Sequence, residues 1–519
     1  MRAAFAAAVN RVRPAPRPVA EESPFLPLGQ IVRCAFLFYL FAYRIVFPLL
    51  VALTSDGARD LLALRFTAEF FYTCLLAYPF IFYRREYGWL HPLVLPVFWE
   101  LGKALAKNPL TLVFPFDFPL VDFTVETHSI AAVLSMSNID LAWTRLQLTL
   151  VHCVAQAAYL AMFLFGPTFA IPRLRLYRPK RIALTASVFI LTAMGLASVF
   201  VIAKGGVSEL LVAMRGGRRM LFEGYGQYVN AALLAPTIAL AWYVYEKRPL
   251  TNVFFIGGLA AAMLTCLIVS GARSSVILAG LTLMLLWWQR RGKAALLPMV
   301  AAAVLGLIVL GGFGSIRQDY RATTVDVSVF NPTQLGTTIQ RAYDEISVRD
   351  DEESALAVMA GSSKKGLLWG RSYLNAAVFW IPRAIWDNKP VGVDFYNMWI
   401  NFNDNQLSST PRDWGTWGIP VDGEMEAYWN FGLPGVIFVF GLLGMFNATW
   451  AKAAYVYRYV PIFWVIYIYA VLNVVGTSKS VVELIRTLVL IALFMLVAGI
   501  IRPSRGSGEH QLSHAGQAG

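Results

Sequence analysis

Residues 182–203 read IALTASVFILTAMGLASVFVIA, a run that contains no charged residue. A helix of this length crosses the hydrocarbon core of a bilayer, which is roughly 30 Å thick. Similar apolar runs recur from end to end of the 519-residue chain, in which hydrophobic residues make up 57% and charged residues 14%. This composition excludes a soluble multidomain protein and predicts an all-α polytopic membrane protein.

Working outward from this run, the apolar pattern predicts about twelve transmembrane helices. They cover residues 31–53, 62–83, 88–106, 146–170, 182–203, 228–246, 252–270, 274–289, 294–313, 432–454, 460–476 and 484–501. The predicted organisation is an N-terminal tail, a first bundle, one large helical loop, a second bundle and a C-terminal tail, at residues 1–30, 31–313, 314–431, 432–501 and 502–519.

The net charge of +13 is concentrated in short loops between the predicted spans. On one side of the membrane these loops hold Arg84, Arg85, Arg173, Arg175, Arg178, Lys180, Arg181, Lys247, Arg248, Arg290, Arg291 and Lys293. Because short cytoplasmic loops are rich in Lys and Arg, we expect both termini to be cytoplasmic. The basic excess then reflects topology, and no nucleic-acid partner is inferred from it.

With both termini inside, residues 314–431 form a large loop on the far side of the membrane. The loop holds 10 basic and 15 acidic residues, whereas the rest of the chain is strongly basic. Helical spacing of apolar residues predicts an amphipathic helix over 335–360 that lies on the membrane face. The acidic run 350–353 is interpreted as a solvated face rather than as a metal site.

Several arginines on this far side break the positive-inside trend and are candidates to bind an anion. The planar guanidinium suits diphosphate, because it donates two hydrogen bonds to one phosphate and stays charged. The candidates are Arg215, Arg218, Arg219, Arg273, Arg317, Arg321, Arg371, Arg383, Arg412 and Arg486. The alternatives are snorkelling to lipid phosphates and, for Arg486, an ion pair with Glu483. Arg65 with Glu69 is interpreted as a local pair outside the site.

Residues 413–435, DWGTWGIPVDGEMEAYWNFGLPG, place three carboxylates, Asp422, Glu424 and Glu426, just before a span. An ionised carboxylate near an arginine is suited to act as the general base toward a sugar hydroxyl. The alternative is that Glu424 only stabilises the start of the helix. Trp417 and Tyr428 belong to an aromatic-rich set that serves either a membrane belt or sugar binding.

Other chemistries lack their residues in this chain. No HExxH, Walker or GxSxG motif is present, and none of the five histidines lies in residues 314–431. The sequence therefore gives no support to zinc hydrolysis, nucleotide hydrolysis or serine hydrolase chemistry.

Three segments together resemble the bacterial oligosaccharide repeat-unit polymerases, the O-antigen or exopolysaccharide polymerase family called Wzy. They are VSGARSS at 269–275, FWIPRAIWDNKP at 379–390 and GEMEAYWNFGLPGVIFVFGLLG at 423–444. Two departures are Ala272, where a small hydroxyl residue is common, and the spacing around Met425 to Tyr428.

The resemblance implies a GT-C-like enzyme of the bacterial inner membrane that needs neither nucleotide sugar nor metal. Its donor and acceptor would be undecaprenyl-diphosphate-linked oligosaccharides, joined with inversion at the periplasmic face. A flippase and a chain-length regulator of the same pathway are the expected partners, beside membrane lipids. By this resemblance, Glu424, Arg273 and Arg383 are the expected catalytic residues, and the expected substrate-binding residues are Arg215, Arg317, Arg321, Arg486, Asp422, Trp417 and Tyr428.

Three alternatives remain at this level. An O-antigen ligase would share the architecture and the donor, but by resemblance it would carry a histidine in the large loop. A lipid-linked oligosaccharide flippase would show two similar halves and short loops. A protein that only regulates chain length would need fewer spans.

Overall fold

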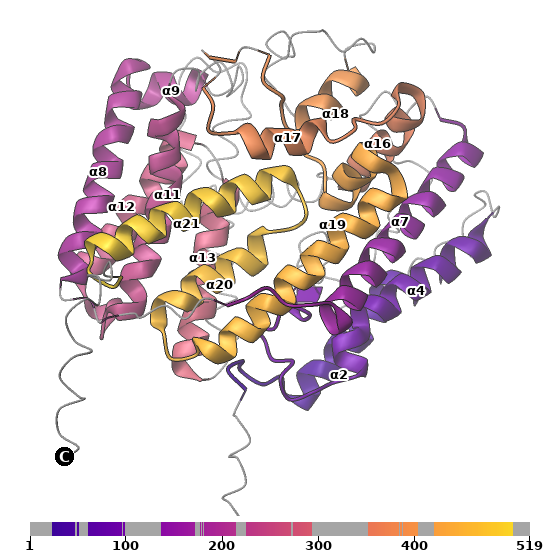
Figure 1. Ribbon diagram of the computed structural model, residues 1–519, viewed down its shortest axis with the longest axis horizontal. Helices are drawn as coiled ribbons and strands as arrows, with labels where there is room; N and C mark the ends of the chain where they lie inside the picture. Colours follow the sequence, from indigo (N-terminus) through magenta and orange to yellow (C-terminus); the bar gives the residue numbers. More distant parts are fainter. Residues whose placement is uncertain are drawn as a thin grey trace, which may run out of the picture.

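The structure is a computed structural model, and it describes most of the helical core. The described residues are 23–46, 49–50, 61–95, 97–98, 136–171, 177, 179, 181–213, 225–270, 273–292, 351–382, 385–386, 388–402 and 420–501. Every regular element within these ranges is a helix (Figure 1).

The helices before residue 300 are α2 (Gln30–Phe41), the π-helical turn η1 (Ala42–Val46), α4 (Leu62–Ile81), α7 (Asn138–Phe165), α8 (Ile182–Ala203), α9 (Val207–Ala213), α11 (Gly226–Tyr245), the 3-10 turn η4 (Pro249–Thr251), α12 (Val253–Ser270) and α13 (Arg273–Arg291). Those after residue 350 are α16 (Asp351–Lys365), α17 (Arg371–Val378), α18 (Val393–Phe402), α19 (Gly423–Val456), α20 (Pro461–Asn473) and α21 (Ser478–Val497).

Among the described residues, five helices are long and apolar enough to cross a membrane. They lie at Ile139–Phe165, Ile182–Ala203, Tyr228–Tyr245, Gly423–Val456 and Ser478–Val497. Two shorter apolar helices, Val253–Val269 and Pro461–Asn473, accompany them. The chain is therefore a helical, membrane-embedded protein, as the hydropathy pattern predicts.

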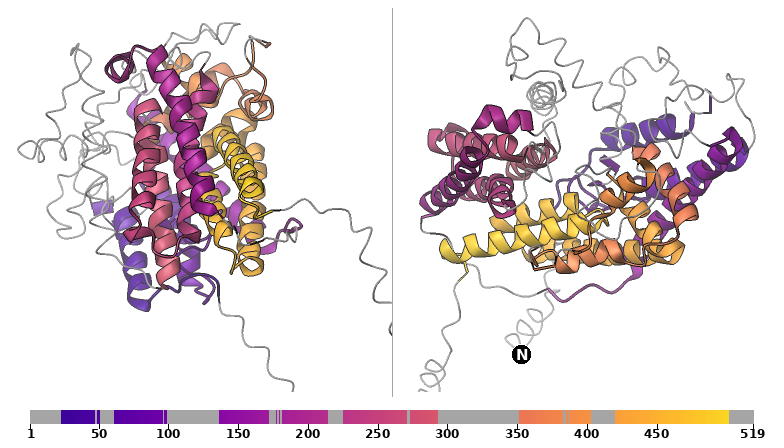
Figure 2. Two further views of the ribbon diagram at one scale, coloured as in Figure 1. Left: turned by 90° about the vertical axis from the view of Figure 1, so that its left-hand side faces the viewer. Right: turned by 90° about the horizontal axis from the view of Figure 1, so that it is seen from above.

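The helices form two groups that the C-terminal helices connect. Figure 2 shows α8, α11, α12 and α13 together on one side and α2, α4 and α7 on the other. Helix α19 packs along α7, whereas α20 and α21 pack against α11. Helices α19, α20 and α21 follow one another in the chain. They thus connect two groups of helices that are far apart in the sequence.

The predicted helix boundaries hold best for uninterrupted apolar runs. The run 182–203 is helix α8 with the same ends. The predicted span 88–106 is wrong at its start, because residues 88–94 form turns. Their polar backbone is satisfied inside the protein, where the Trp89 amide donates to the Leu26 carbonyl at 2.8 Å. The predicted span 294–313 lies outside the described residues.

Helices α16 and α19 begin within the predicted large loop, and the start of α19 differs from its prediction. Of the helix predicted over 335–360, residues 335–350 lie outside the described residues, and α16 begins at Asp351. The acidic run therefore lies at a helix N-terminus, where carboxylates are favourable with the helix dipole. Helix α19 begins at Gly423, ahead of the expected start at 432, because the Asp422 side chain caps it.

The end of α13, which carries Arg290 and Arg291, lies with the end of α11 on the side of the bundle opposite α16, α17 and α18 (Figure 1). Arg290 at the end of α13 donates to the Lys247 carbonyl at the end of α11, at 2.7 Å. Further hydrogen bonds between segments at this end join Tyr83 to Leu28, Lys452 to Thr168 and Tyr177 to Ile500.

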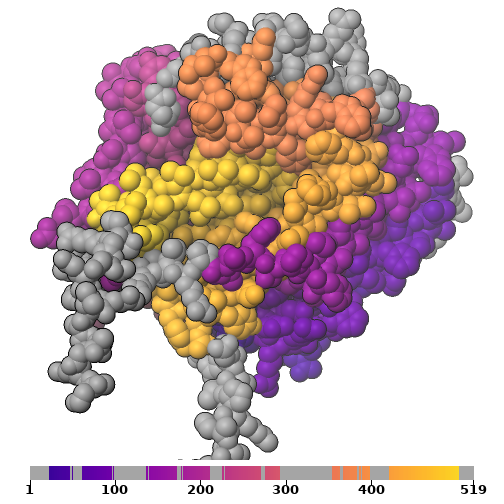
Figure 3. All heavy atoms as spheres, in the orientation of Figure 1, coloured from indigo at the N-terminus to yellow at the C-terminus, as the bar shows by residue number. Residues whose placement is uncertain are grey.

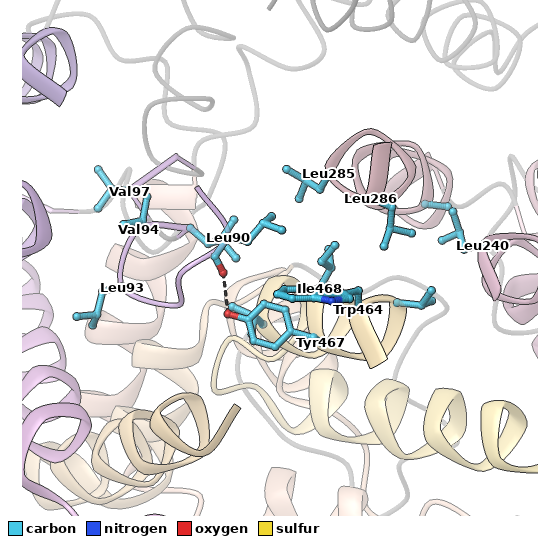
Figure 4. Close-up of a cluster of buried hydrophobic side chains, with 14 of the residues drawn as sticks. Leu90, Leu93, Val94, Val97, Leu240, Leu285, Leu286, Trp464, Tyr467 and Ile468 are labelled. Carbon is cyan, nitrogen blue, oxygen red and sulfur yellow. Dashed lines mark hydrogen bonds between the residues drawn. The ribbon is translucent and has the colours of Figure 1, made fainter. Parts of the chain in front are cut away.

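The largest apolar core lies beneath the crossing of α20 with the turns at 88–94. Figure 4 shows Leu90, Leu93 and Val94 facing Trp464, Tyr467 and Ile468, with Leu240, Leu285 and Leu286 from α11 and α13 nearby. The Tyr467 hydroxyl donates to the Leu90 carbonyl at 2.7 Å. A buried phenol thus satisfies the backbone of the irregular segment that it covers.

An ion pair inside the bundle joins α2, α4 and α7 and corrects the expected pairing of Arg65 with Glu69. The Glu69 carboxylate lies 3.0 Å from the Arg44 guanidinium on η1. Thr149 on α7 donates to the other carboxylate oxygen at 3.1 Å. The partner of Glu69 therefore comes from a different helix, which sequence spacing alone does not reveal.

Candidate functional site

The candidate site is built around the start of α19, whose helical ladder is interrupted at Gly432. Gly432 has φ 67° and ψ −159°, a conformation open to glycine, and Pro434 lacks the N–H that would bond to the Asn430 carbonyl. The segment before α17 supplies donors instead. The amides of Leu368 and Trp369 donate to the carbonyls of Trp429 and Asn430 at 2.9 and 3.0 Å. The break in α19 therefore fixes α17 beside it.

A buried carboxylate lies at the centre of this junction. The fully buried Glu426 accepts hydrogen bonds from the Ser372 hydroxyl at 2.6 Å and from the Ser478 amide at 3.0 Å. Asn430, one turn further along α19, donates to the Ser372 hydroxyl and to the Glu426 carbonyl, both at 2.7 Å. We call Glu426, Ser372, Asn430 and Ser478 the Glu426 cluster. It joins α17, α19 and the N-terminus of α21, whose dipole favours a carboxylate there.

The turn between α20 and α21 lies directly against the start of α19. A Cβ atom at Gly423 would lie 2.0 Å from the Val475 carbonyl oxygen, so this approach requires glycine. Gly476 in the same turn has φ 83°, and its carbonyl accepts a hydrogen bond from the Tyr373 hydroxyl at 3.1 Å. Three separate segments therefore meet within a few ångströms of one another.

The two glutamates of the junction, Glu424 and Glu426, lie in different environments. Glu426 is buried with its oxygens occupied by donors, whereas Glu424 is half-buried in the first turn of α19. Burial raises the pKa of Tyr373, and the carboxylates of Glu426 and Glu424 raise it further. The Tyr373 hydroxyl therefore stays protonated and remains a donor. Of the two glutamates, Glu424 is the one that a substrate can approach.

Arg486 on α21 lies near the residues that follow α17. Its guanidinium donates to the Asn230 side chain on α11 at 3.1 Å, and its Cζ lies 5.3 Å from the centre of the Phe379 ring. The alternative ion pair with Glu483 is not formed, and Glu483 instead accepts a hydrogen bond from Asn473 at 3.4 Å. An ionisable group that lies within a span and has no ion pair with a neighbour on its own helix usually has a functional role.

Lys389 closes the segment that follows α17 into a loop. Its ammonium group is buried and donates to the carbonyls of Phe379 and Ile381 at 2.8 and 2.9 Å. The two ends of FWIPRAIWDNKP are thereby held together, and the Phe379 ring stays against Arg486. The lysine of this segment thus has a structural role that its sequence position did not indicate.

The structure places only part of the predicted site. Asp422 caps α19 by accepting from the Met425 amide at 2.9 Å, and Tyr428 is partly buried against the core. Arg273 is the first residue of α13. The predicted residues outside the described part of the chain are Arg215, Arg317, Arg321, Arg383 and Trp417.

Several residues of the junction were not anticipated from the sequence. Ser372, Tyr373 and Ser478 are ordinary small or aromatic residues, and no local sequence pattern marks them. Asn430 does carry a signal, because it lies four residues after Glu426 and so shares its helix face. That spacing, combined with a following glycine and proline, indicates a polar cluster at a helix break.

Comparisons with known proteins identify no relative of this chain. No protein family, curated protein or solved structure matches the chain. The class defined by the fold remains that of a helical protein embedded in a membrane.

Proposed function

We propose that this protein polymerises polyprenyl-diphosphate-linked oligosaccharide repeat units into a surface polysaccharide at the outer face of a bacterial inner membrane. The reaction class is an inverting glycosyl transfer that uses no divalent ion.

The observation that carries the proposal is the meeting of two segments that resemble the polymerases. Residues 379–390 and 423–444 are well separated in sequence. In the structure, the Ser372–Glu426 hydrogen bond and the bonds from Leu368 and Trp369 hold α17, which directly precedes residues 379–390, against the start of α19. The 379–389 loop also contacts Arg486 through Phe379. A cation, a half-buried carboxylate and both segments therefore lie in one region.

The proposed topology follows from charge. The basic end of α13 and the end of α11 that it contacts lie opposite α16, α17 and α18, and short basic loops are retained in the cytoplasm. This arrangement supports both termini on the cytoplasmic side and residues 314–431 on the periplasmic side. Lipid-linked glycans would then approach Glu424 from the outer leaflet.

The proposed reaction has one displacement step. Glu424 removes the proton from a hydroxyl group of the acceptor glycan, and that oxygen attacks the anomeric carbon of the donor. The bond between this carbon and the diphosphate oxygen breaks, and its electron pair leaves with the polyprenyl diphosphate. Attack from the opposite face inverts the anomeric configuration.

Arginines are proposed to stabilise the leaving diphosphate. Arg486, Arg273 and Arg383 supply guanidinium groups that stay charged and donate to two oxygens at once. In a site of low dielectric constant, fixed donors of this kind stabilise developing negative charge strongly. The Glu426 cluster has a different role here, which is to hold α17 and α21 in place relative to Glu424.

The proposal is tested with purified full-length protein in nanodiscs that contain polyprenyl-diphosphate-linked repeat units. We expect lipid-linked glycans of increasing length, in the presence of a chelator, with release of polyprenyl diphosphate. Glu424→Gln and Arg486→Lys are expected to abolish elongation while protein yield stays normal. Glu483→Gln, on the same face of α21, is the matched control and should retain activity.

Two outcomes would contradict the proposal. One is elongation that requires added magnesium or manganese. The other is transfer of the glycan only to a lipid A core acceptor, which would identify a ligase instead.

A further inference from the structure

The part of the chain between α16 and α18 exposes large apolar side chains in an unusual concentration. Within residues 351–402 and 420–422, as far as they are described, the exposed large hydrophobic residues are Trp369, Leu374, Trp380 and Ile385. Trp369 is 75% exposed, Trp380 is 70% exposed and Ile385 is 79% exposed. We call residues 369–385 the Trp segment. Side chains of this size are costly to leave in water over one continuous stretch.

The exposed Trp369 side chain belongs to a residue with an unusual backbone conformation. Trp369 has φ 51°, a left-handed conformation that is uncommon for a residue with a bulky side chain. It is held there because its amide bonds to the Asn430 carbonyl at the break in α19. Backbone strain of this kind persists where the surroundings fix it, often at functional positions. The exposed position of the Trp369 indole is thus accompanied by a strained backbone conformation.

Helix α17, which begins two residues after Trp369, is anchored in the protein through one face. Ser372 and Tyr373 bond to Glu426 and to the Gly476 carbonyl, while Leu374 points away from them. Helix α17 is therefore amphipathic, with one face bound to the Glu426 cluster and one face left for a partner.

The neighbouring surfaces show which partner fits. Helix α17 contacts both α19 and α21, and Figure 3 shows the orange segments directly above the surfaces of these two helices. Both helices are candidate spans that expose several large apolar residues, including Phe438 and Val489. The Trp segment continues this lipid-facing surface, and the exposed Arg371 beside Trp369 suits lipid phosphates.

We propose that the Trp segment lies in the headgroup region of the bilayer and binds phospholipid at the boundary between headgroups and acyl chains. Tryptophan is enriched at this depth because its ring is apolar and its N–H is polar. The segment therefore sets the depth of the Glu426 cluster, which lies on the other face of α17. A group carried at the head of a lipid is thereby held at the level of the half-buried Glu424 without leaving the bilayer. This inference does not depend on the polymerase activity.

The test uses wild-type protein in nanodiscs that contain a phospholipid with a photoactivatable diazirine near its headgroup. Mass spectrometry then locates the carbene adducts, and hydroxyl-radical oxidation is measured on a parallel sample. We expect adducts on Trp369 and Trp380, with little oxidation of either residue. Phe438 and Val489 serve as positive controls for lipid contact, and the buried Trp429 should show neither modification.

Substitutions at Trp380 test the same point without relying on one probe. Trp380→Phe should keep the lipid adducts on Leu374, whereas Trp380→Asp should lose them because a carboxylate is excluded from this depth. Rapid oxidation of Trp369 and Trp380 in the wild type, without adducts, would overturn the proposal. Protection that develops only when free oligosaccharide is added would also overturn it, and would identify a sugar-binding surface. No glycosyl transfer is measured, so failure here leaves the polymerase proposal to its own test.

Discussion

The carboxylate of Glu426 accepts a hydrogen bond from the Ser372 hydroxyl at 2.6 Å, across 54 positions of sequence. Glu426 also accepts from the Ser478 amide, so one buried side chain links α17, α19 and α21. Glu424, two residues earlier, lies on a different face of α19 and is half-buried. Neighbouring glutamates of one helical turn thus have different environments and are expected to respond differently to substitution.

Replacing each glutamate by glutamine separates stability from activity. Glu426→Gln replaces one of the two acceptor oxygens that bind Ser372 and Ser478 with an NH2 group, and should lower the free energy of unfolding by about 1–3 kcal/mol. Glu424→Gln removes the charge that interacts favourably with the helix dipole, worth about 0.3–1 kcal/mol, and should abolish glycan elongation. Unfolding in mixed micelles of rising SDS fraction measures the first effect. Equal stability of the two variants would contradict the assignment of Glu426 as the residue that positions these helices.

The close approach of Gly423 to the Val475 carbonyl predicts a steric effect. Gly423→Ala should destabilise the protein by about 1–3 kcal/mol, because the new Cβ forces α19 away from the turn between α20 and α21. Gly195→Ala in α8 is the matched control, since nothing lies within 4 Å of that position. The control should be neutral or stabilising by about 0.5–1 kcal/mol. The same micelle unfolding experiment compares the two, and a neutral Gly423→Ala would show that the turn is displaced.

The pair Arg44 and Glu69 is expected to show coupling between helices. Arg44→Glu places two carboxylates together inside the bundle and should cost on the order of 3 kcal/mol. The double variant Arg44→Glu with Glu69→Arg restores an attractive pair and should recover much of that loss. A double-mutant cycle of unfolding free energies measures the coupling.

The control for this cycle is the exposed pair Arg84 and Glu86, which lies 3.5 Å apart at the surface. Reversing Arg84 there should leave stability unchanged, because solvent screens the pair. A double variant of the partly buried Arg44–Glu69 pair that is no more stable than Arg44→Glu alone would indicate that Glu69 has a role other than pairing with Arg44.

The environment of Tyr373 predicts a loss of stability at alkaline pH. Its pKa is raised by burial and by two glutamates, so the folded state resists ionisation of the phenol, whereas the unfolded state ionises near pH 10. The unfolding free energy should therefore fall as the pH rises above about 10. Tyr373→Phe removes this ionisable group and should flatten the decline, at the cost of one hydrogen bond to Gly476. Thermal unfolding of both proteins from pH 8 to pH 11 measures the difference, and parallel curves would contradict it.

The apolar segments were predictable because their signal is local. Residues 182–203 and 274–289 contain long runs of apolar side chains, and each coincides closely with a helix. The start of α19 was placed too late because Asp422 caps the helix and the first turns carry polar residues that bond inside the protein. The segment at 88–94 was predicted as helix because an apolar composition does not distinguish a spanning helix from buried turns.

The sequence by itself determined that this protein is helical and embedded in a membrane, since burial of long uncharged runs in lipid depends only on composition and length. It also singled out candidate carboxylates and arginines, whose part in glycosyl transfer stays a prediction. The tertiary structure decided which of them are neighbours. Glu69 pairs with Arg44 rather than Arg65, Arg486 with Asn230 rather than Glu483, and Glu426 with Ser372. Such contacts join residues that helix packing brings together, and no spacing along the chain encodes them.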